Sequence, residues 1–312
     1  NKEFEVTPNE GYNIDTMSVT CDPVANTTIN NNIIKVNDIR QNHNCIVSFD
    51  KKTYTVDIEV INGSSNAINK IVEHGESATA TITPNIGYTL SNATVSGEGC
   101  SINNDTLTIS NVTSNGKCIV TLPRDKYNVT LSGDGVTVTN SPQVVEYEGS
   151  TTFNVSANTG YTLSNAAVNC DGGAQASLNG SIVTVSNITQ ATTCTITPIQ
   201  LSYDVTLVVN NGTGGSTKNV THGGSPTFNV GANTGYNLTN PSITCTGSAT
   251  GTISGSTVTI RNVTTVQTCT VNLNRNTYGV NVYSNNTGMG TVSPGSSVVS
   301  HGDNLTITLS PK

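Results

Sequence analysis

Short apolar stretches that alternate with polar residues run along the whole chain. In one of them Val183 and Val185 are separated by Thr, and in another Leu107 and Ile109 are separated in the same way. Turns rich in Asn and Gly, such as Asn179-Gly180, follow at intervals of about 8–12 residues. Strict alternation over short segments favours strands that bury one face. Since no stretch has the periodicity of a helix, the sequence predicts an all-β fold.

Two landmarks recur along the chain with a common period of about 75 residues, which indicates tandem repeats. One landmark is a Gly-Tyr pair, and the other is a Tyr followed by alternating apolar residues. The first begins at Gly11, Gly87, Gly160 and Gly235, and the second at Tyr54, Tyr127, Tyr203 and Tyr278. We therefore expect an array of small β-sandwich or β-grasp-like modules.

The landmarks divide the chain into five parts. Residues 51–124, 125–200 and 201–275 each form a complete β repeat module. Residues 1–50 begin in the third strand of a module, so they form the C-terminal part of a split module. Residues 276–312 stop after the third strand, so they form the N-terminal part of another.

The two split modules leave three interpretations open. The chain is a window of a longer array, or it closes on itself as a ring or propeller, or residues 276–312 of one subunit complete residues 1–50 of the next. Residues 1–50 alone would leave unpaired strand edges, and the third interpretation would build a head-to-tail filament by strand complementation. Its candidate subunit-joining strands contain Phe4, Val6, Tyr278, Val280, Val282, Leu305, Ile307 and Leu309.

Eight cysteines occur as one pair in each module and one pair in residues 1–50. We expect a disulfide within each unit, linking the strand after Gly-Tyr to the last strand; free buried thiols are the alternative. The absence of closely spaced pairs opposes a metal site. A disulfide that closes a loop of about 20–25 residues contributes on the order of 3 kcal/mol to the stability of a unit whose core is small. The expected pairs are Cys21/Cys45, Cys100/Cys118, Cys170/Cys194 and Cys245/Cys269.

Two strings of the first complete module, GYTLSNATVSGEGC and TLTISNVTSNGKCIVTL, resemble the divergent internalin-type B-repeats of bacterial surface proteins. Related strings, GYTLSNAAVNC and GYNLTNPSITC, follow in the next two modules. The resemblance implies repeats that act as spacers and stalks in long secreted or wall-attached proteins, and it implies no catalytic residues. The paired cysteines depart from the usual pattern of that family.

Charge and composition narrow the range of partners and compartments. Only 11% of residues are charged and the net charge is −7, so no basic surface is available for nucleic acid. No apolar run reaches the ~18 residues that a membrane span requires. Disulfides place a protein outside the cytosol, hyperthermophile interiors excepted. We expect an extracellular or cell-surface location and no cofactor.

The recurring polar and aromatic residues favour structural roles over a site. His74, His222 and His301 precede Gly at one repeat position. When the repeats are aligned on that Gly, the module 125–200 has Glu148 at this position. One His per module cannot surround a metal, so a turn residue is favoured. The repeated Tyr of Gly-Tyr is favoured as a core or corner residue over a sugar-stacking platform.

Asn-x-Ser/Thr sequons are numerous but only slightly exceed the number expected by chance in so Asn- and Thr-rich a chain. They make the protein a candidate glycoprotein. The candidate sites are Asn62, Asn92, Asn111, Asn187, Asn219, Asn262 and Asn304.

Taken together, these features predict a structural protein, a surface stalk or filament that self-associates head to tail. The alternative is an adhesin or phage-fibre-like protein that presents a surface for cell-surface glycans or proteins. No calcium loop, paired-carboxylate or Ser-His-Asp pattern is present, so we expect no enzyme.

Overall fold

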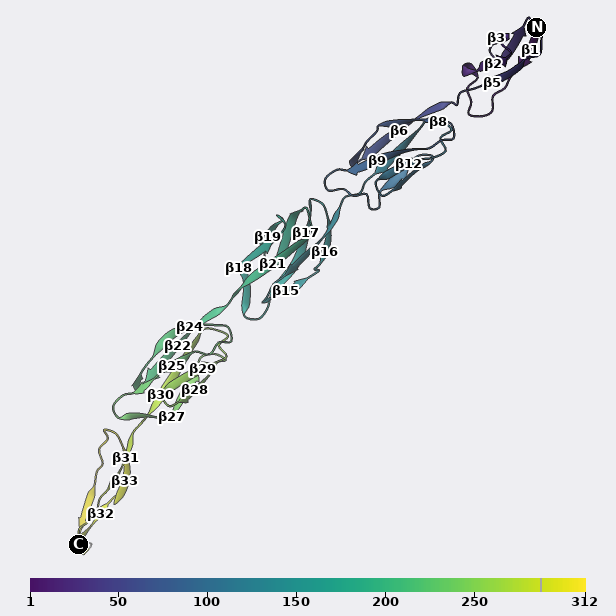
Figure 1. Ribbon diagram of the computed structural model, residues 1–312. Helices are drawn as coiled ribbons and strands as arrows, with labels where there is room; N and C mark the ends of the chain where they lie inside the picture. The colour runs from purple at the N-terminus through teal and green to yellow at the C-terminus, as the bar shows by residue number, and fades with distance from the viewer. Residues whose placement is uncertain (287) are drawn as a thin grey trace.

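The computed structural model describes residues 1–286 and 288–312 and is a long rod (Figure 1). Three complete modules follow one another between two half-modules, and the termini lie at opposite ends of the rod. The strands run roughly along the axis of the rod. Among the described residues, none forms a helix of the length and apolar character that crossing a bilayer demands.

Each complete module is a sandwich of two sheets. In residues 51–124 one sheet has the order β10-β13-β6-β8 and the other the order β11-β12-β9-β7. The first strand β6 pairs with the last strand β13 in parallel, whereas all other neighbours are antiparallel. The strands are β6 (Thr53–Ile61), β7 (Gly63–Ser65), β8 (Asn69–Glu73), β9 (Ala78–Pro84), β10 (Thr94–Ser96), β11 (Cys100–Asn103), β12 (Thr106–Ile109) and β13 (Gly116–Thr121).

The second complete module repeats this plan. Its sheets have the orders β16-β14-β21-β18 and β15-β17-β20-β19, and β14 and β21 are the parallel pair. The strands are β14 (Lys126–Ser132), β15 (Val136–Thr139), β16 (Gln143–Glu146), β17 (Gly149–Ala157), β18 (Tyr161–Cys170), β19 (Gln175–Asn179), β20 (Ile182–Ile188) and β21 (Thr192–Gln200).

The third complete module differs only in that its second sheet is interrupted in the strand that corresponds to β9. The first sheet has the order β24-β22-β30-β27, and the second is split into β23-β26 and β25-β29-β28. The strands are β22 (Ser202–Asn210), β23 (Gly212–Thr213), β24 (Ser216–Thr221), β25 (Thr227–Asn229), β26 (Gly231–Ala232), β27 (Tyr236–Cys245), β28 (Thr250–Ser254), β29 (Thr257–Arg261) and β30 (Gln267–Arg275).

The half-modules hold complementary parts of the same sandwich. Residues 1–50 form the sheets β1-β4-β3 and β2-β5, and residues 276–312 form the pairs β31-β33 and β32-β34. One 3-10 turn, η1 (Ile14–Thr16), follows the first Gly-Tyr pair. The strands are β1 (Lys2–Glu5), β2 (Ser18–Asp22), β3 (Asn26–Asn30), β4 (Ile33–Asn37), β5 (Asn44–Ser48), β31 (Thr277–Asn281), β32 (Gly290–Ser293), β33 (Ser296–Ser300) and β34 (Thr308–Pro311).

The predicted all-β fold is confirmed, and its core follows from the alternation in the sequence. In β17 Phe153 and Val155 point inward between exposed neighbours, and in β20 Val183 and Val185 meet them from the adjacent strand. Burying such side chains contributes about 1.5–3 kcal/mol each. Each complete module therefore has its own core, in contrast to a single core shared along the rod.

Two strands of each module were not apparent in the sequence. They are the short strand after the first one (β7, β15, β23) and the strand before the clearly alternating one (β11, β19, β28). Gly63–Ser65 and Gly212–Thr213 contain only Gly, Ser and Thr, which give no apolar alternation. These strands lie at sheet edges, where a half-exposed strand needs few apolar residues. The exception is β15, in which Val136 and Val138 alternate with Thr and Val136 is buried.

We expect Phe153→Ala to destabilise its module by about 3–5 kcal/mol, because it removes a completely buried ring and leaves a cavity. The exposed neighbour Thr152→Val should change stability by less than about 0.5 kcal/mol. Urea unfolding followed by circular dichroism measures both. Because modules of an array unfold separately, one of the transitions should move in Phe153→Ala while the rest stay in place. Equal effects of the two variants would contradict this assignment of the core.

Candidate assembly site

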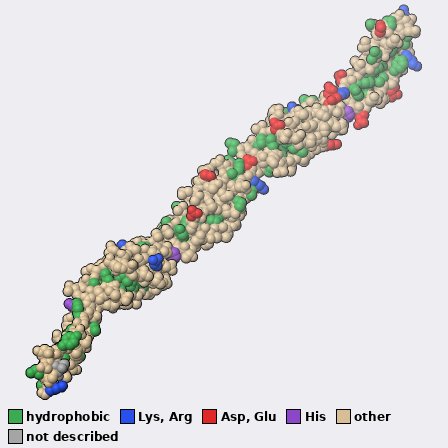
Figure 2. Space-filling model, turned by 60° about the horizontal axis from the view of Figure 1, so that its bottom comes forward, with side chains coloured by type: hydrophobic (Ala, Val, Ile, Leu, Met, Phe, Trp, Pro, Cys, Tyr) green, Lys and Arg blue, Asp and Glu red, His purple; other side chains and the backbone are tan. Residues whose placement is uncertain are grey.

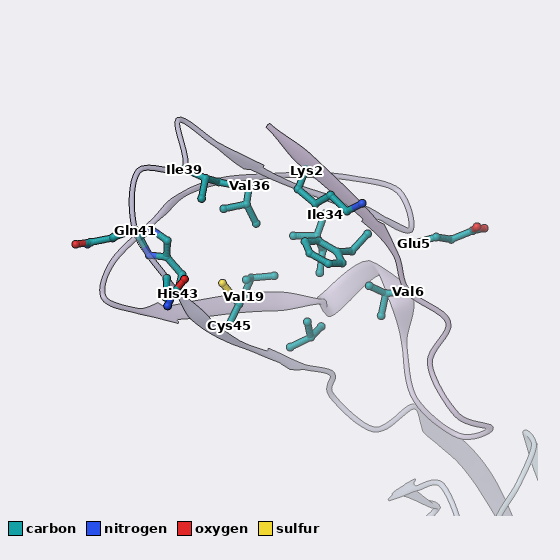
Figure 3. Close-up of a pocket in the computed structure, with 13 residues that line it drawn as sticks. Lys2, Glu5, Val6, Val19, Ile34, Val36, Ile39, Gln41, His43 and Cys45 are labelled. Atoms are coloured by element: carbon teal, nitrogen blue, oxygen red, sulfur yellow. The ribbon is translucent and has the colours of Figure 1, made fainter.

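The N-terminal half-module has an open groove where a complete module has further strands. Val19, Val47, Ile34 and Val36 line a cavity of about 550 Å³ that opens to solvent, and Phe4 is 50% exposed at its edge. Figure 3 shows Val19 on one side of this space and Ile34 and Val36 on the other. Apolar side chains also gather on the surface of this half-module in Figure 2. The groove therefore lies between the two sheets of residues 1–50, and Ile34 and Val36 in its lining are buried, at 3% and 5% exposed.

The missing strands can be named by comparison with the complete modules. In residues 51–124, strand β13 lies between β10 and β6, and β8 lies beyond β6. In residues 1–50 the corresponding strand β5 has only β2 beside it. Only Met17, Ile34 and Val36 form a buried cluster there, whereas each complete module has eleven buried core residues. Residues 1–50 therefore contain no counterparts of β6, β7 and β8.

The C-terminal half-module contains those counterparts. Strand β31 corresponds to β6, β32 to β7, β33 to β8, and β34 to β9. Its apolar residues have no partner sheet, so Tyr278 is 50% and Leu309 70% exposed. All four described residues of β34 are exposed, as are those of β1, the corresponding strand at the other end. The two ends therefore display complementary sets of strands and one strand in common.

The structure places four of the eight candidate joining residues on these strands and the other four, Val6, Val282, Leu305 and Ile307, beside them. Phe4 is in β1, and Tyr278 and Val280 are in β31, paired with β33. Leu309 is in β34 and pairs with Val292, while Ile307 and Leu305 lie just before that strand. Val6 follows β1, and its amide donates to the carbonyl of Asn32.

Cysteine pairs connect the strands of each unit in two ways. Cys21–Cys45, Cys170–Cys194 and Cys245–Cys269 join directly opposed residues of antiparallel strands, with Cα atoms 4.0 Å apart. Cys100–Cys118 differs: Cys100 starts β11 in one sheet and Cys118 lies in β13 of the other, with Cα atoms 5.9 Å apart. The expectation that every bridge starts in the strand after Gly-Tyr is therefore wrong for this module.

Gly97 explains how the bridge of this module changes sheets. Val95 opposes Val120 in the ladder, so Gly97 comes opposite Cys118, where the other modules have Cys170 and Cys245. A Cβ atom on Gly97 would collide with the carbonyl oxygen of Lys117 and would lie 2.7 Å from the Cys100 sulfur. The sulfur of Cys100 thus occupies the space that a side chain would need at this position.

A repeated backbone contact joins successive modules. The carbonyl of the Gly in each Gly-Tyr pair accepts from the next linker residue, as Gly160 does from Leu201 at 2.8 Å. The carbonyl of Leu201 in turn accepts from the amide of His222 at 2.9 Å. The same pair of bonds recurs through Gly11–Lys52–His74, Gly87–Asp125–Tyr147 and Gly235–Asn276–His301.

The histidines before Gly are residues of these joints. The ring of His222 packs on Gly160 of the preceding module and lies 5.9 Å from the ring of Tyr203. His74 and His301 make the corresponding contacts with Tyr54 and Tyr278. Among the described residues no three His, Cys, Asp or Glu side chains gather as metal ligands.

The assignment of Glu148 to the histidine position is wrong by one residue. Tyr147 packs on Gly87, as His222 does on Gly160, while the amide of Glu148 donates to Ile188. The corresponding donors elsewhere are Gly75 and Gly223, and Glu148 shares their positive φ, at 59°. The sequence did not predict that Glu148 stands at the position of these glycines, because Glu rarely occupies the left-handed conformation that Gly adopts readily.

Charged groups also pair near the first and last joints. The backbone of Lys51 forms an isolated β-bridge with Tyr12 of the preceding half-module. The Lys51 ammonium group donates to the Glu76 carboxylate at 2.6 Å and lies 3.9 Å from that of Glu73. This one hydrogen bond between Lys51 and Glu76 raises the pKa of the Lys51 ammonium and lowers the pKa of the Glu76 carboxyl. Arg275 and Asp303 pair at 2.9 Å at the last joint. These groups are exposed, so such pairs add little stability.

Five of the seven candidate sequons, all but Asn219 and Asn304, have an Asn whose positive φ explains its presence. Asn111, Asn187 and Asn262 share one repeat position, are exposed and have φ of 52–57°. Asn adopts this left-handed conformation more readily than other residues. The amides of Asn62 and Asn219 donate to Leu122 and Asp204. Glycosylation at any of these sites stays a prediction.

The repeated Tyr residues lie at the ends of the modules. Tyr88 and Tyr236 are half-buried against the cores of their modules, and the Arg124 guanidinium lies 5.8 Å from the centre of the Tyr88 ring. Tyr161 packs on Gly135, where a Cβ would lie 2.6 Å from the ring. These contacts give the Tyr side chains a packing role at the joints.

Comparison with known proteins supports the family resemblance for one module. Residues 54–118 match the divergent InlB B-repeat domain, which confirms the resemblance there. No curated protein matches the sequence. Among solved structures, the pilus adhesin SpaC from Lactobacillus rhamnosus GG is similar at 8% identity, with a TM-score of 0.26. That match covers 88% of this chain and 56% of the adhesin, so the chain spans little more than half of that protein's length.

We expect Gly160→Ala to loosen the joint between its module and the next. A Cβ there would lie 2.7 Å from the His222 ring, whereas at Gly223, in the same joint, it would meet open space. Both glycines have similar positive φ, 85° and 77°, so the backbone cost is matched, at about 1 kcal/mol. Small-angle X-ray scattering should show a shorter maximum dimension for Gly160→Ala and an unchanged profile for Gly223→Ala. Identical scattering profiles for the two variants would show that the contact of His222 with Gly160 does not keep the rod straight at this joint.

Proposed function

We propose that this chain is an extracellular structural protein whose subunits join head to tail into a surface stalk or filament. The observation that carries the proposal is the complementarity of its ends. Residues 1–50 lack the counterparts of β6, β7 and β8, and residues 276–312 contain them as β31, β32 and β33. Inserted into the groove of a second copy, these strands would complete one further sandwich like the three in the rod. The match of residues 54–118 to a bacterial surface repeat and the disulfides support the extracellular placement.

The complete modules give the register of the proposed joint. Tyr54 and Tyr278 occupy the same repeat position, and Ile58 lies beside Cys118 in the parallel ladder. Transferred to the joint, this register brings Val282 of the donor beside Cys45 of the acceptor. It also brings Tyr283 beside Ile46, two side chains that are 80% and 70% exposed in the free ends. The joint would bury Val282, which takes the place of Ile58, 8% exposed in its own module. Tyr283 takes the place of the exposed Glu59, on the outer face of the sandwich.

The strand common to both ends has a specific consequence for assembly. In a complete module β9 lies between β12 and β7, so the joint has room for either β1 or β34, but not both. Strand β34 pairs with β32 through four residues, and β1 pairs with β4 through four residues as well. We propose that the donor enters as one unit and that β34 displaces β1 from β4. The ejected residues would then be Lys2–Glu5, which are exposed already.

We expect Val280→Asp to abolish assembly. In the joint Val280 takes the place of Val56, which is 4% exposed, and an unpaired carboxylate there would be strongly unfavourable. The control is Val298→Asp on the adjacent strand β33, where the side chain is 73% exposed and stays outside the sandwich. Sedimentation velocity over a range of concentrations, with electron microscopy, measures assembly. Wild type and Val298→Asp should form linear polymers; a wild-type chain that remains monomeric at high concentration would sink the proposal.

A cysteine pair tests the register itself. In the chain carrying Tyr283→Cys and Ile46→Cys, we expect oxidation to give a ladder of covalent oligomers on a non-reducing gel, because parallel neighbours bring the two sulfurs within bonding distance. The control pair is Tyr283→Cys with Ile29→Cys, since Ile29 is exposed but lies in β3 of the other sheet. A ladder of equal yield from the control pair would show non-specific association.

A further inference from the structure

Because of the path of the chain through the rod, tension along the rod passes through each complete module in series. Strand β21 ends at Gln200 and β22 begins at Ser202; likewise β30 ends at Arg275 and β31 begins at Thr277. The last strand of one module thus continues almost directly into the first strand of the next. Any tension along the rod enters a module through its first strand and leaves through its last.

These two strands are neighbours and run in the same direction. In residues 51–124, Val56–Ile61 pair in parallel with Gly116–Thr121. The same arrangement joins β14 to β21 and β22 to β30. Because tension pulls the first strand toward one end of the rod and the last strand toward the other, the ladder between them is loaded along its length. Its hydrogen bonds then resist together, whereas antiparallel neighbours pulled from one end would separate one bond at a time.

The disulfides hold the last strand to the rest of its module. Cys194 and Cys269 tie β21 and β30 to the antiparallel strand on their far side, and Cys118 ties β13 to the opposite sheet. The last strand therefore cannot be peeled away, and the parallel ladder is the part that yields. Residues between the two cysteines stay locked even after it yields.

We propose that each complete module resists tension through the parallel pairing of its first strand with its last strand. Tension loads the hydrogen bonds of this ladder in shear, so that together they hold the module closed. The rod would transmit force between an attachment at one end and a partner at the other, with the disulfides limiting its extension. The ladder of β14 with β21 has four residue pairs, against six in each of the other two. The module 125–200 is accordingly the first to yield. This role depends on the complete modules alone, so it stands whether or not the ends join.

Single-molecule stretching of the 312-residue chain, held by tags at its two ends, tests the proposal. We expect three discrete unfolding steps, one per complete module. Reductant should lengthen two of the steps by about 8 nm and one by about 6 nm, at ~3.4 Å per released residue. These values follow from cysteine separations of 24 residues in two modules and 18 in the third. A wild-type chain that extends smoothly, without discrete steps, would overturn the proposal.

Matched proline variants identify the ladder that bears the load. The amide of Ile58 donates to Ile68 on the β8 side, so the alternating backbone directs the amide of Glu59 toward β13. Glu59→Pro should at least halve the unfolding force of one step, the one that gains about 6 nm on reduction. Glu59→Ala controls for the lost ion pair with Lys117, and Lys70→Pro removes a donor from the antiparallel ladder of β8 with β6. Both controls should leave the force unchanged.

A second variant covers the case in which Glu59→Pro prevents its module from folding. Val208 pairs with Thr270 of β30 and lies beyond the stretch of β22 that pairs with β24. Val208→Pro should weaken one of the two steps that gain about 8 nm on reduction. An equal loss of force in Lys70→Pro, or an unchanged force in a folded Val208→Pro module, would show that the parallel ladder does not carry the load.

Discussion

The pairing of the first strand of each module with its last strand is the interaction on which the rest of the rod depends. It closes a sandwich out of a continuous stretch of chain, and it does so in parallel, as β6 and β13 do. Because both strands run the same way, the chain enters at one end of the module and leaves at the other. A linear rod follows from this topology without any special linker.

The joints convert a row of modules into a straight rod. Each one reuses two backbone hydrogen bonds and a ring stacked on the Gly of a Gly-Tyr pair, so its geometry depends on a residue without a side chain. His74, His222, His301 and Tyr147 fill the same space, which shows that ring shape matters more there than the imidazole. The repeated histidine is thus a packing residue, and the Gly-Tyr landmark is the surface that receives it.

The sequence predicted the fold class, the repeat and the strands with clear alternation, because Val183 and Val185 or Leu107 and Ile109 carry the pattern directly. It did not predict strands such as Gly63–Ser65, whose residues pair through the backbone and bury almost nothing. It also misplaced Glu148, since only the backbone dihedral reveals that this residue stands where other modules have Gly. The change of sheet at Cys100 depends on Gly97, a contact between residues that no local pattern relates. The groove of residues 1–50 could be anticipated as missing strands, but its lining required the positions of both sheets.

The separation between the two clamped strands also sets a schedule for synthesis. Val56 pairs with Gly116, so a nascent first strand must wait for about 60 further residues before its partner leaves the ribosome. At 5–20 residues per second this is a delay of roughly 3–12 seconds. During that time an earlier module with a similar last strand is the nearest competitor, and pairing with it would entangle neighbours. Rapid closure of the local hairpins, followed by oxidation of the cysteines, would favour the correct partner for each first strand.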